Sequence, residues 1–264
     1  MNTDRLVRGP SVTITWQSTV DWIVIHDWAH HQGIDTRSST TPIGSLVARL
    51  GRGGNLDDLV EFAGRQCYRS WSSGRAPFEY IDNILSSGHG SVLEHAVVSF
   101  AIAGVSRSLS HELVRHRAGF AYSQESQRYV DAKDMRFVIP PAYLDHRELE
   151  EIFLLDCTND LERYVWWQEK AREIVKGGKK EVNQAARWKL PNAAETRLVA
   201  TLNLRAMRHF FETRGALAAD PEIRRLAIAM YDVARPLAPL TFHDFKSYEY
   251  TDMEKHLECQ YHKV

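Results

Sequence analysis

The densest run of side chains that could do chemistry lies at residues 115–129, RHRAGFAYSQESQRY. It opens on arginine, histidine and arginine in succession, and Gln124, Ser126 and Arg128 follow on a polar segment. Guanidinium groups bind phosphate bidentately, and amide and hydroxyl groups hydrogen-bond the edges of carbonyl-rich rings. The pattern therefore favours recognition of a small phosphorylated ligand.

Arginines are concentrated in two segments although the 264-residue chain, with 33 basic and 34 acidic residues, has a formal charge of −1. Residues 107–128 carry four arginines against two glutamates, and residues 187–214 carry six basic against two acidic residues. An acidic segment, 145–163, compensates. The neutral total argues against a protein that coats nucleic acid or a membrane surface through bulk charge. The two basic segments could form one anion-binding cleft, although any single arginine could instead be solvated or paired with the acidic segment.

Other kinds of site find less support. His111 and His116 stand five residues apart, so their rings point to different sides of a helix, unlike the four-residue spacing of zinc hydrolases. His89 and His95 have no cysteine or aspartate cluster beside them, and we predict no metal site.

Covalent catalysis and phosphate-binding loops are also poorly supported. No serine stands in a GxSxG motif and no cysteine has an adjacent basic partner. The glycine-rich runs at 51–54 and 177–180 lack the nucleotide-binding fingerprints, so we expect flexible loops there.

Apolar periodicity predicts the elements that position these residues. The expected elements are helices at 57–67, 77–88, 106–117, 145–180, 206–214 and 220–236, a strand at 96–103 buried on both faces, a strand at 196–204, and a polar loop after residue 117. Helices and strands alternate loosely, which predicts a single α/β (α+β) domain with a central sheet flanked by helices. Residues 1–55 are rich in turn formers, and we expect an extension with weak structure and no assigned function.

Composition indicates a soluble protein of the cytoplasm. The chain is 44% hydrophobic and 25% charged, without an N-terminal apolar run or a stretch long enough to span a membrane. Its three cysteines, Cys67, Cys157 and Cys259, lie far apart, which suits a reducing compartment.

The order of several motifs resembles the flavin-dependent thymidylate synthases. HGSVLEH at 89–95 is followed by a buried strand, by SRSLSHELVRHR at 106–117 and by SQESQRY at 123–129. The match continues through Ala186-Arg187 before Leu190-Pro191, Asn203-Leu204-Arg205, His209 and Arg214, and it covers about residues 57 to 245. We therefore expect an enzyme domain at 56–250, between the N-terminal extension and a C-terminal tail at 251–264.

The resemblance implies a reaction and its participants. These are the reductive methylation of dUMP to dTMP, methylene-tetrahydrofolate as carbon donor, FAD as hydride carrier and NADPH as reductant. It also implies a homotetramer with active sites built from several subunits. It gives no nucleic-acid partner.

The resemblance also assigns roles to individual residues. Arg214 corresponds to the catalytic residue that polarises the uracil ring near N3, and no protein side chain attacks the pyrimidine. The implied cofactor contacts are Ser91, Arg115, His116, Arg117, Gln124, Asn203, Leu204, Arg205 and His209. The implied dUMP contacts are Glu112, Leu113, Val114, Arg115, Gln124, Glu125, Ser126, Gln127, Arg128, Arg187 and Arg214.

One spacing departs from the family pattern. Eight residues, instead of seven, separate the RHR triplet from Ser126, and we expect a glycine bulge near 118–120 to absorb the extra one. Two alternatives stay open: a non-catalytic nucleotide or nucleic-acid binding module that uses the same arginines, and a family member impaired by this spacing. Ser91 could instead be a cap, and His95 a core histidine.

Overall fold

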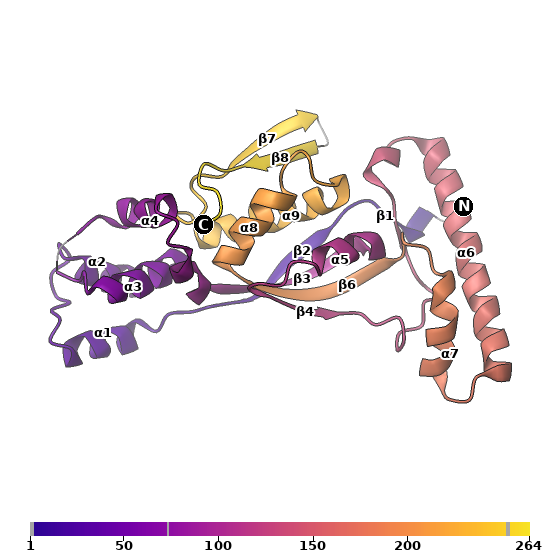
Figure 1. Cartoon of the computed structure of the whole chain (residues 1–264), viewed down its shortest axis with the longest axis horizontal. Coiled ribbons are helices and arrows are strands. Elements are labelled where there is room, and N and C mark those ends of the chain that lie inside the picture. Colours follow the sequence, from indigo (N-terminus) through magenta and orange to yellow (C-terminus); the bar gives the residue numbers. More distant parts are fainter. Residues whose placement is uncertain (1–2, 73, 252–253) are drawn as a thin grey trace.

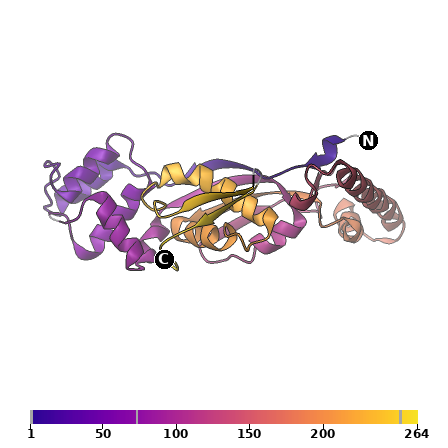
Figure 2. The ribbon, with the colours of Figure 1, turned by 90° about the horizontal axis from the view of Figure 1, so that it is seen from above.

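The computed structural model describes residues 3–72, 74–251 and 254–264. Residues 1–2 of the expected extension and 252–253 of the expected tail lie outside this range. The molecule is elongated: a central sheet carries helices on one face, four N-terminal helices lie at one end, and a long helical arm lies at the other (Figures 1 and 2). The expected mixed fold with a central sheet is confirmed.

The central sheet is antiparallel throughout and has the strand order β2-β3-β6-β4. Its strands are β2 (Ser11–Gln17), β3 (Val97–Ser106), β6 (Glu195–Asn203) and β4 (Phe120–Gln124). Two short pairs accompany it, β1 (Leu6–Val7) with β5 (Phe137–Val138), and β7 (Lys246–Thr251) with β8 (Glu254–Glu258). The expected polar loop after residue 117 thus contains an edge strand, and part of the expected tail is a hairpin.

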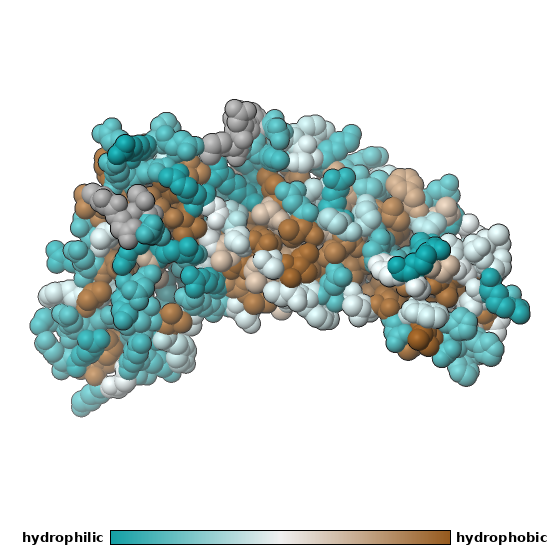
Figure 3. Space-filling view, turned by 180° about the vertical axis from the view of Figure 1, so that it is seen from behind, coloured by the Kyte–Doolittle hydropathy of each residue, from teal (hydrophilic) through white to brown (hydrophobic). Residues whose placement is uncertain are grey.

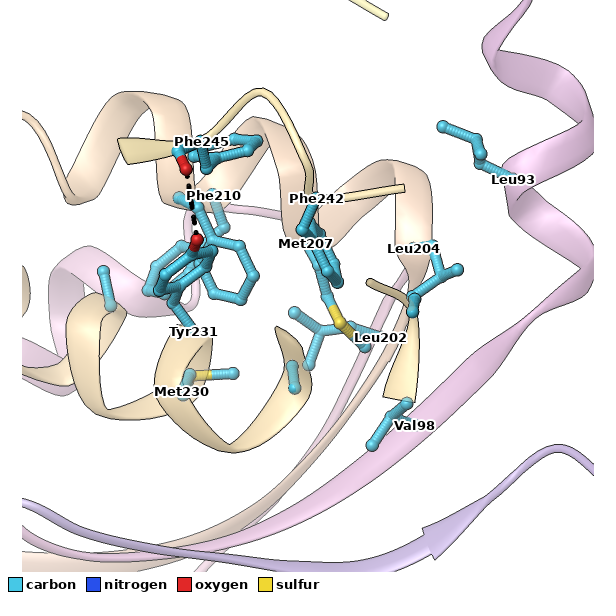
Figure 4. Close-up of a cluster of buried hydrophobic side chains, with 14 of the residues drawn as sticks. Leu93, Val98, Leu202, Leu204, Met207, Phe210, Met230, Tyr231, Phe242 and Phe245 are labelled. Carbon is cyan, nitrogen blue, oxygen red and sulfur yellow. Dashed lines mark hydrogen bonds between the residues drawn. The ribbon is translucent and has the colours of Figure 1, made fainter. Parts of the chain in front are cut away.

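The pairing of residues between the strands shows which side chains share each face of the sheet. Ile14, Phe100, Ala200 and Tyr122 stand side by side across the four strands, and they face or border the main core. Three helices cover this face: α5 (Arg107–Leu113), α8 (Leu204–Arg214) and α9 (Pro221–Ala234). Figure 4 shows side chains from β3, β6, α8 and α9 converging in this core.

The opposite face of the sheet is open in the single chain. Thr13, Ala101, Val199 and Ser123 form the matching row there, and Val199 is 41% exposed. Figure 3 shows a band of apolar side chains across the middle of this side. The expectation that the strand at 96–103 is buried on both faces is therefore wrong for one chain, because no helix in the described part of the chain covers the second face.

Four helices lie at the N-terminal end, α1 (Trp22–His31), α2 (Pro42–Leu50), α3 (Leu56–Tyr68) and α4 (Pro77–Ser86). Buried side chains of α1 and α2 form a small core with Trp71, whereas α3 and α4 contribute buried side chains to the main core. Arg49 on α2 donates to Asp58 on α3 at 2.7 Å, and the Asn55 capping box starts α3. The expectation of weak structure at 1–55 is wrong. β2 has alternating apolar side chains, and Asp21 and Thr41 cap the starts of α1 and α2. These signals specify regular structure in spite of the turn-rich composition.

The arm consists of α6 (Arg147–Ile174) and α7 (Lys179–Ala186), with a third core that includes Leu161 and Tyr164. Glu181 accepts from the Gly178 backbone N–H at 3.0 Å and starts α7, so residues 177–180 are a helix entry where we expected a flexible loop. Short 3₁₀ helices are also present, at Thr3–Arg5, Gly90–His95 (η2), Pro141–Tyr143, Arg187–Lys189 and Arg235–Leu237.

The other expected elements are confirmed with shifted ends. The helix expected at 106–117 stops at Leu113, and the helix expected at 145–180 ends at Ile174. In the described part of the chain, no helix combines the length and apolar character needed to cross a membrane.

Candidate functional site

Arg214, at the end of α8, reaches back to the segment that begins with α5. Its Nη1 donates to Glu112 Oε2 at 2.9 Å, and its Nε donates to His116 Nε2 at 2.9 Å. Both contacts are half-buried, and they join residues about a hundred positions apart. The two basic segments found in the sequence therefore meet within a single chain.

His116 is neutral at physiological pH. Burial, together with the charge of Arg214 and the nearby His209, lowers its pKa from 6.5 to about 4. Its Nε2 therefore accepts the hydrogen bond from Arg214, which places the ring proton on Nδ1. The ring lies against Phe120 and Phe210, which fix its orientation.

The other end of α5 carries a second pair of cations. Arg107 is the first residue of α5. Its pKa is lowered mainly by burial and, in second place, by the like charge of Arg187. Two neighbouring guanidinium groups attract an anion such as a phosphate. Arg107 was not among the expected site residues, although its place in the basic segment 107–128 signalled it.

The loop after β4 brings a further arginine. Gln124 donates to Thr196 Oγ1 at 3.0 Å, and the Arg128 backbone N–H donates to Ser126 Oγ at 3.4 Å. The Nε of Arg128 is buried and finds no hydrogen-bond partner among the described residues. A buried donor without a partner is costly, and a bound anion would satisfy it.

A cavity of about 330 Å³ lies beside His116, whose ring contacts that of His209 on the cavity wall. Asn203, Arg205 and His209 line it, together with the backbone of Gly119. Gly119 has a φ of +72°, and a Cβ there would lie 2.7 Å from the Asn203 side chain. A left-handed glycine thus stands where we expected the extra residue to be absorbed.

Ser91 lines a second cavity, of about 310 Å³, on η2. Arg205 lines both cavities and also binds Glu94 at 2.6 Å. Ser91 and His95 are exposed, so the alternative of a core histidine at 95 is wrong. The position that precedes η2 is His89, and the Ser91 side chain caps no helix in the described part of the chain.

Some expected residues lie elsewhere. The side chains of Leu113 and Leu204 are enclosed in the core, so only their backbones could touch a ligand. Glu125 and Gln127 line a separate cavity of about 310 Å³ with Arg136 and Arg197. Arg115 and Arg117 are exposed in the turn after α5, where Val114 is half-buried.

Two of the three cysteines are unsuited to act as nucleophiles. Burial raises the pKa of Cys259 to about 11 and that of Cys157 to about 12, while Cys67 is a free thiol on the surface. Thiolates are the reactive form, so neither buried cysteine is activated.

Comparison with known proteins identifies the family. The family model described as thymidylate synthase complementing protein matches residues 50–240. The flavin-dependent thymidylate synthase of Mycobacterium avium (strain 104) is 48% identical over 200 residues, which cover 71% of this chain and 79% of that protein. That of Mycobacterium tuberculosis (strain ATCC 25177 / H37Ra) is 47% identical over the same shares. The chain belongs to the flavin-dependent thymidylate synthase family.

Solved structures agree on the fold of this flavin-dependent thymidylate synthase family member. The UMP/dUMP methylase PolB of Streptomyces cacaoi, bound with 5-Br dUMP, superposes with a TM-score of 0.59 at 21% identity. The match covers 90% of this chain and 95% of that one. The same protein bound with 5-Br UMP gives a TM-score of 0.60 at 18% identity.

A flavin-dependent thymidylate synthase must hold a large anionic cofactor, and the residues present fit that need. The cavity beside Gly119 offers the Asn203 amide and the Arg205 guanidinium, and glycine leaves the backbone open to close approach. The second cavity adds Ser91 on the other side of Arg205.

Proposed function

We propose that the site around α5 and the end of α8 performs the reductive methylation of dUMP to dTMP. Membership of the family supports the reaction and the flavin. The observation that supports its place in this chain is the contact of Arg214 with both Glu112 and His116, which joins the two basic segments.

Arg214 is suited to stabilise negative charge on a uracil ring. Glu112 and neutral His116 fix the guanidinium plane, and His116 brings no charge of its own to compete with it. A cation held in advance where charge develops lowers the barrier more than one that must reorganise. In this proposal Arg214 polarises the ring, and no cysteine attacks it.

The opposite end of α5 is suited to hold the nucleotide phosphate. Arg107 and Arg187 lie near each other there. The unpartnered Nε of Arg128 offers a further donor to the same kind of anion.

The cofactor would lie against Asn203, Arg205, His209 and Ser91, which line the two adjoining cavities. When bound, FAD supplies the hydride chemistry, and the protein provides binding and orientation. NADPH as reductant and methylene-tetrahydrofolate as carbon donor belong to the same proposal, as does a cytoplasmic location.

The open face of the sheet supports the homotetramer as part of this proposal. The 41% exposed Val199, the apolar band in Figure 3 and the absence of a covering helix among the described residues are features of a surface that another copy would bury. Exposed aromatic side chains on the arm, Trp166 and Trp167, add apolar surface outside the sheet.

The purified protein tests the proposal directly. We expect a yellow protein with a flavin spectrum that forms dTMP from dUMP, methylene-tetrahydrofolate and NADPH. A colourless protein that takes up no added FAD would contradict the flavoenzyme and leave the binding module, which the relatives do not support. Bound flavin without product would instead favour impairment by the extra residue before Ser126.

A further inference from the structure

Three potential metal ligands outside the proposed reaction converge at the end of α8. Glu212 lies on α8, and Cys259 and His262 follow β8. Their ligand atoms, a carboxylate oxygen, a sulfur and an imidazole nitrogen, all lie within 4.8 Å of one another. The sequence alone could not show this cluster, because Glu212 precedes His262 by 50 residues.

The distances between these atoms suit a tetrahedral ion. At a tetrahedral angle, bonds of about 2.3 Å to sulfur and about 2.0 Å to nitrogen place those two ligands about 3.5 Å apart. Cys259 Sγ lies 3.7 Å from His262 Nδ1, and His262 Nδ1 lies 3.0 Å from Glu212 Oε1. Only small side-chain shifts would be needed to admit an ion.

The backbone that carries the ligands is held by a buried ion pair. Arg208 and Asp244 form a bidentate pair, and each also binds the backbone of Tyr261, between Cys259 and His262. The Arg208 and Asp244 side chains are 3% and 0% exposed. A ligand set placed on such a fixed backbone loses little conformational entropy when it binds.

We propose that Glu212, Cys259 and His262 bind a zinc ion, with water as the fourth ligand. Sulfur, nitrogen and carboxylate oxygen are the ligands that Zn²⁺ takes in proteins, and three protein ligands leave one position open. The His262 side chain is 64% exposed, so the ion is reachable from solvent. Binding releases the Cys259 thiol proton to solvent as the thiolate forms.

The zinc site lies beside the cavity assigned to the flavin. Any effect of the ion on flavin binding rests on the proposed function. Glu212, Tyr261, Lys263 and Val264 line that cavity, and Arg205 donates to the Val264 carbonyl at 3.3 Å. An ion on Glu212 and His262 would fasten this wall of the cavity to α8.

Zinc retention by the full-length protein tests the proposal. Chelator-treated protein is dialysed against ZnCl₂, then against metal-free buffer, and its metal content is measured by atomic emission. We expect one zinc per chain in the wild type and in the control His31→Gln, an exposed histidine on α1. Cys259→Ser and His262→Gln should weaken binding by more than about a hundredfold, beyond the usual cost of losing an outer partner.

Co²⁺ gives a second readout that does not depend on flavin or turnover. Tetrahedral Co²⁺ bands should appear in the wild type and be lost in Cys259→Ser. Folded wild-type protein that retains no zinc, or equal retention by Cys259→Ser, would overturn the proposal. Faster FAD loss without zinc would support the link to the cavity, whereas equal FAD loss would overturn that link and leave the metal site standing.

Discussion

Arg214 is the residue on which the two halves of the site depend. It is the cation shared by Glu112 on α5 and His116 after it, so its removal leaves a carboxylate and a neutral imidazole without their common donor. The sequence predicted the residue and its role through the resemblance. It could not predict the partners, because they lie about a hundred positions away.

Arg214→Ala should lower dTMP formation by at least about a hundredfold while FAD retention changes little. The reason is that its contacts lie toward α5, and the cavity assigned to the flavin is lined by Asn203, Arg205 and His209. Turnover and flavin content measured on the same preparation check this. Arg163→Ala, at an exposed position on α6, is the control, and equal loss of turnover and flavin would contradict the assignment.

His116 should titrate near pH 4. Because burial and Arg214 lower its folded pKa below the ordinary 6.5, the unfolded chain binds more protons between these two values. The stabilising contribution is full above pH 6.5 and is lost as pH falls toward 4. Urea unfolding should show that the free energy of unfolding falls less from pH 7 to pH 5 in His116→Gln than in the wild type. An NMR titration midpoint for His116 near 6.5 would refute this.

At the scale of elements, residues with a strong periodic signal were predictable and residues ordered by tertiary pairing were not. α3, α4 and α9 carry apolar faces with clear starts and stops, and they were predicted close to their bounds. β4 is five residues long, lies at the edge of the sheet and carries polar side chains, so only its pairing with β6 specifies it. Because this segment was predicted as a loop, the place of Gln124 at the end of a strand was not predicted.

The turn between the RHR triplet and β4 depends on Gly119. Gly119→Ala should weaken flavin retention and also destabilise the fold, because the added Cβ would lie 2.8 Å from that of Ala206 in addition to the cost of a positive φ. Gly33→Ala is the matched control, since Gly33 has a φ of +70° with nothing within 4 Å. The control should lose only about 1 kcal/mol of unfolding free energy and no flavin. Equal flavin retention in the two variants would argue against the role of Gly119.

At the scale of the whole molecule, one chain alone leaves the second face of its central sheet exposed. Its residues alternate with core residues along each strand, so the same strands serve two environments. The sequence indicated burial on both faces of β3, and the second copy proposed above would provide it.

Val199→Lys should convert the assembly to smaller species, because it replaces an exposed apolar side chain of the open face by a charge. Leu217→Lys, which is similarly exposed at 45% in the loop after α8, should leave the assembly unchanged. Size-exclusion chromatography with light scattering distinguishes the two, and an unchanged mass for Val199→Lys would contradict an interface there.

The buried hydrophobic side chains form three separate clusters, so we expect the protein to unfold in more than one cooperative step. The main core includes α3 and α4, whereas the cluster of α1 and α2 and the cluster of the arm are separate from it, so these two can open as their own units. Calorimetry should therefore resolve more than one thermal transition. Leu161→Ala in the arm should shift one transition, by a cost of about 2–5 kcal/mol, and leave the others in place. The arm could then melt and reform while the sheet that carries Arg214 and its partners stays folded.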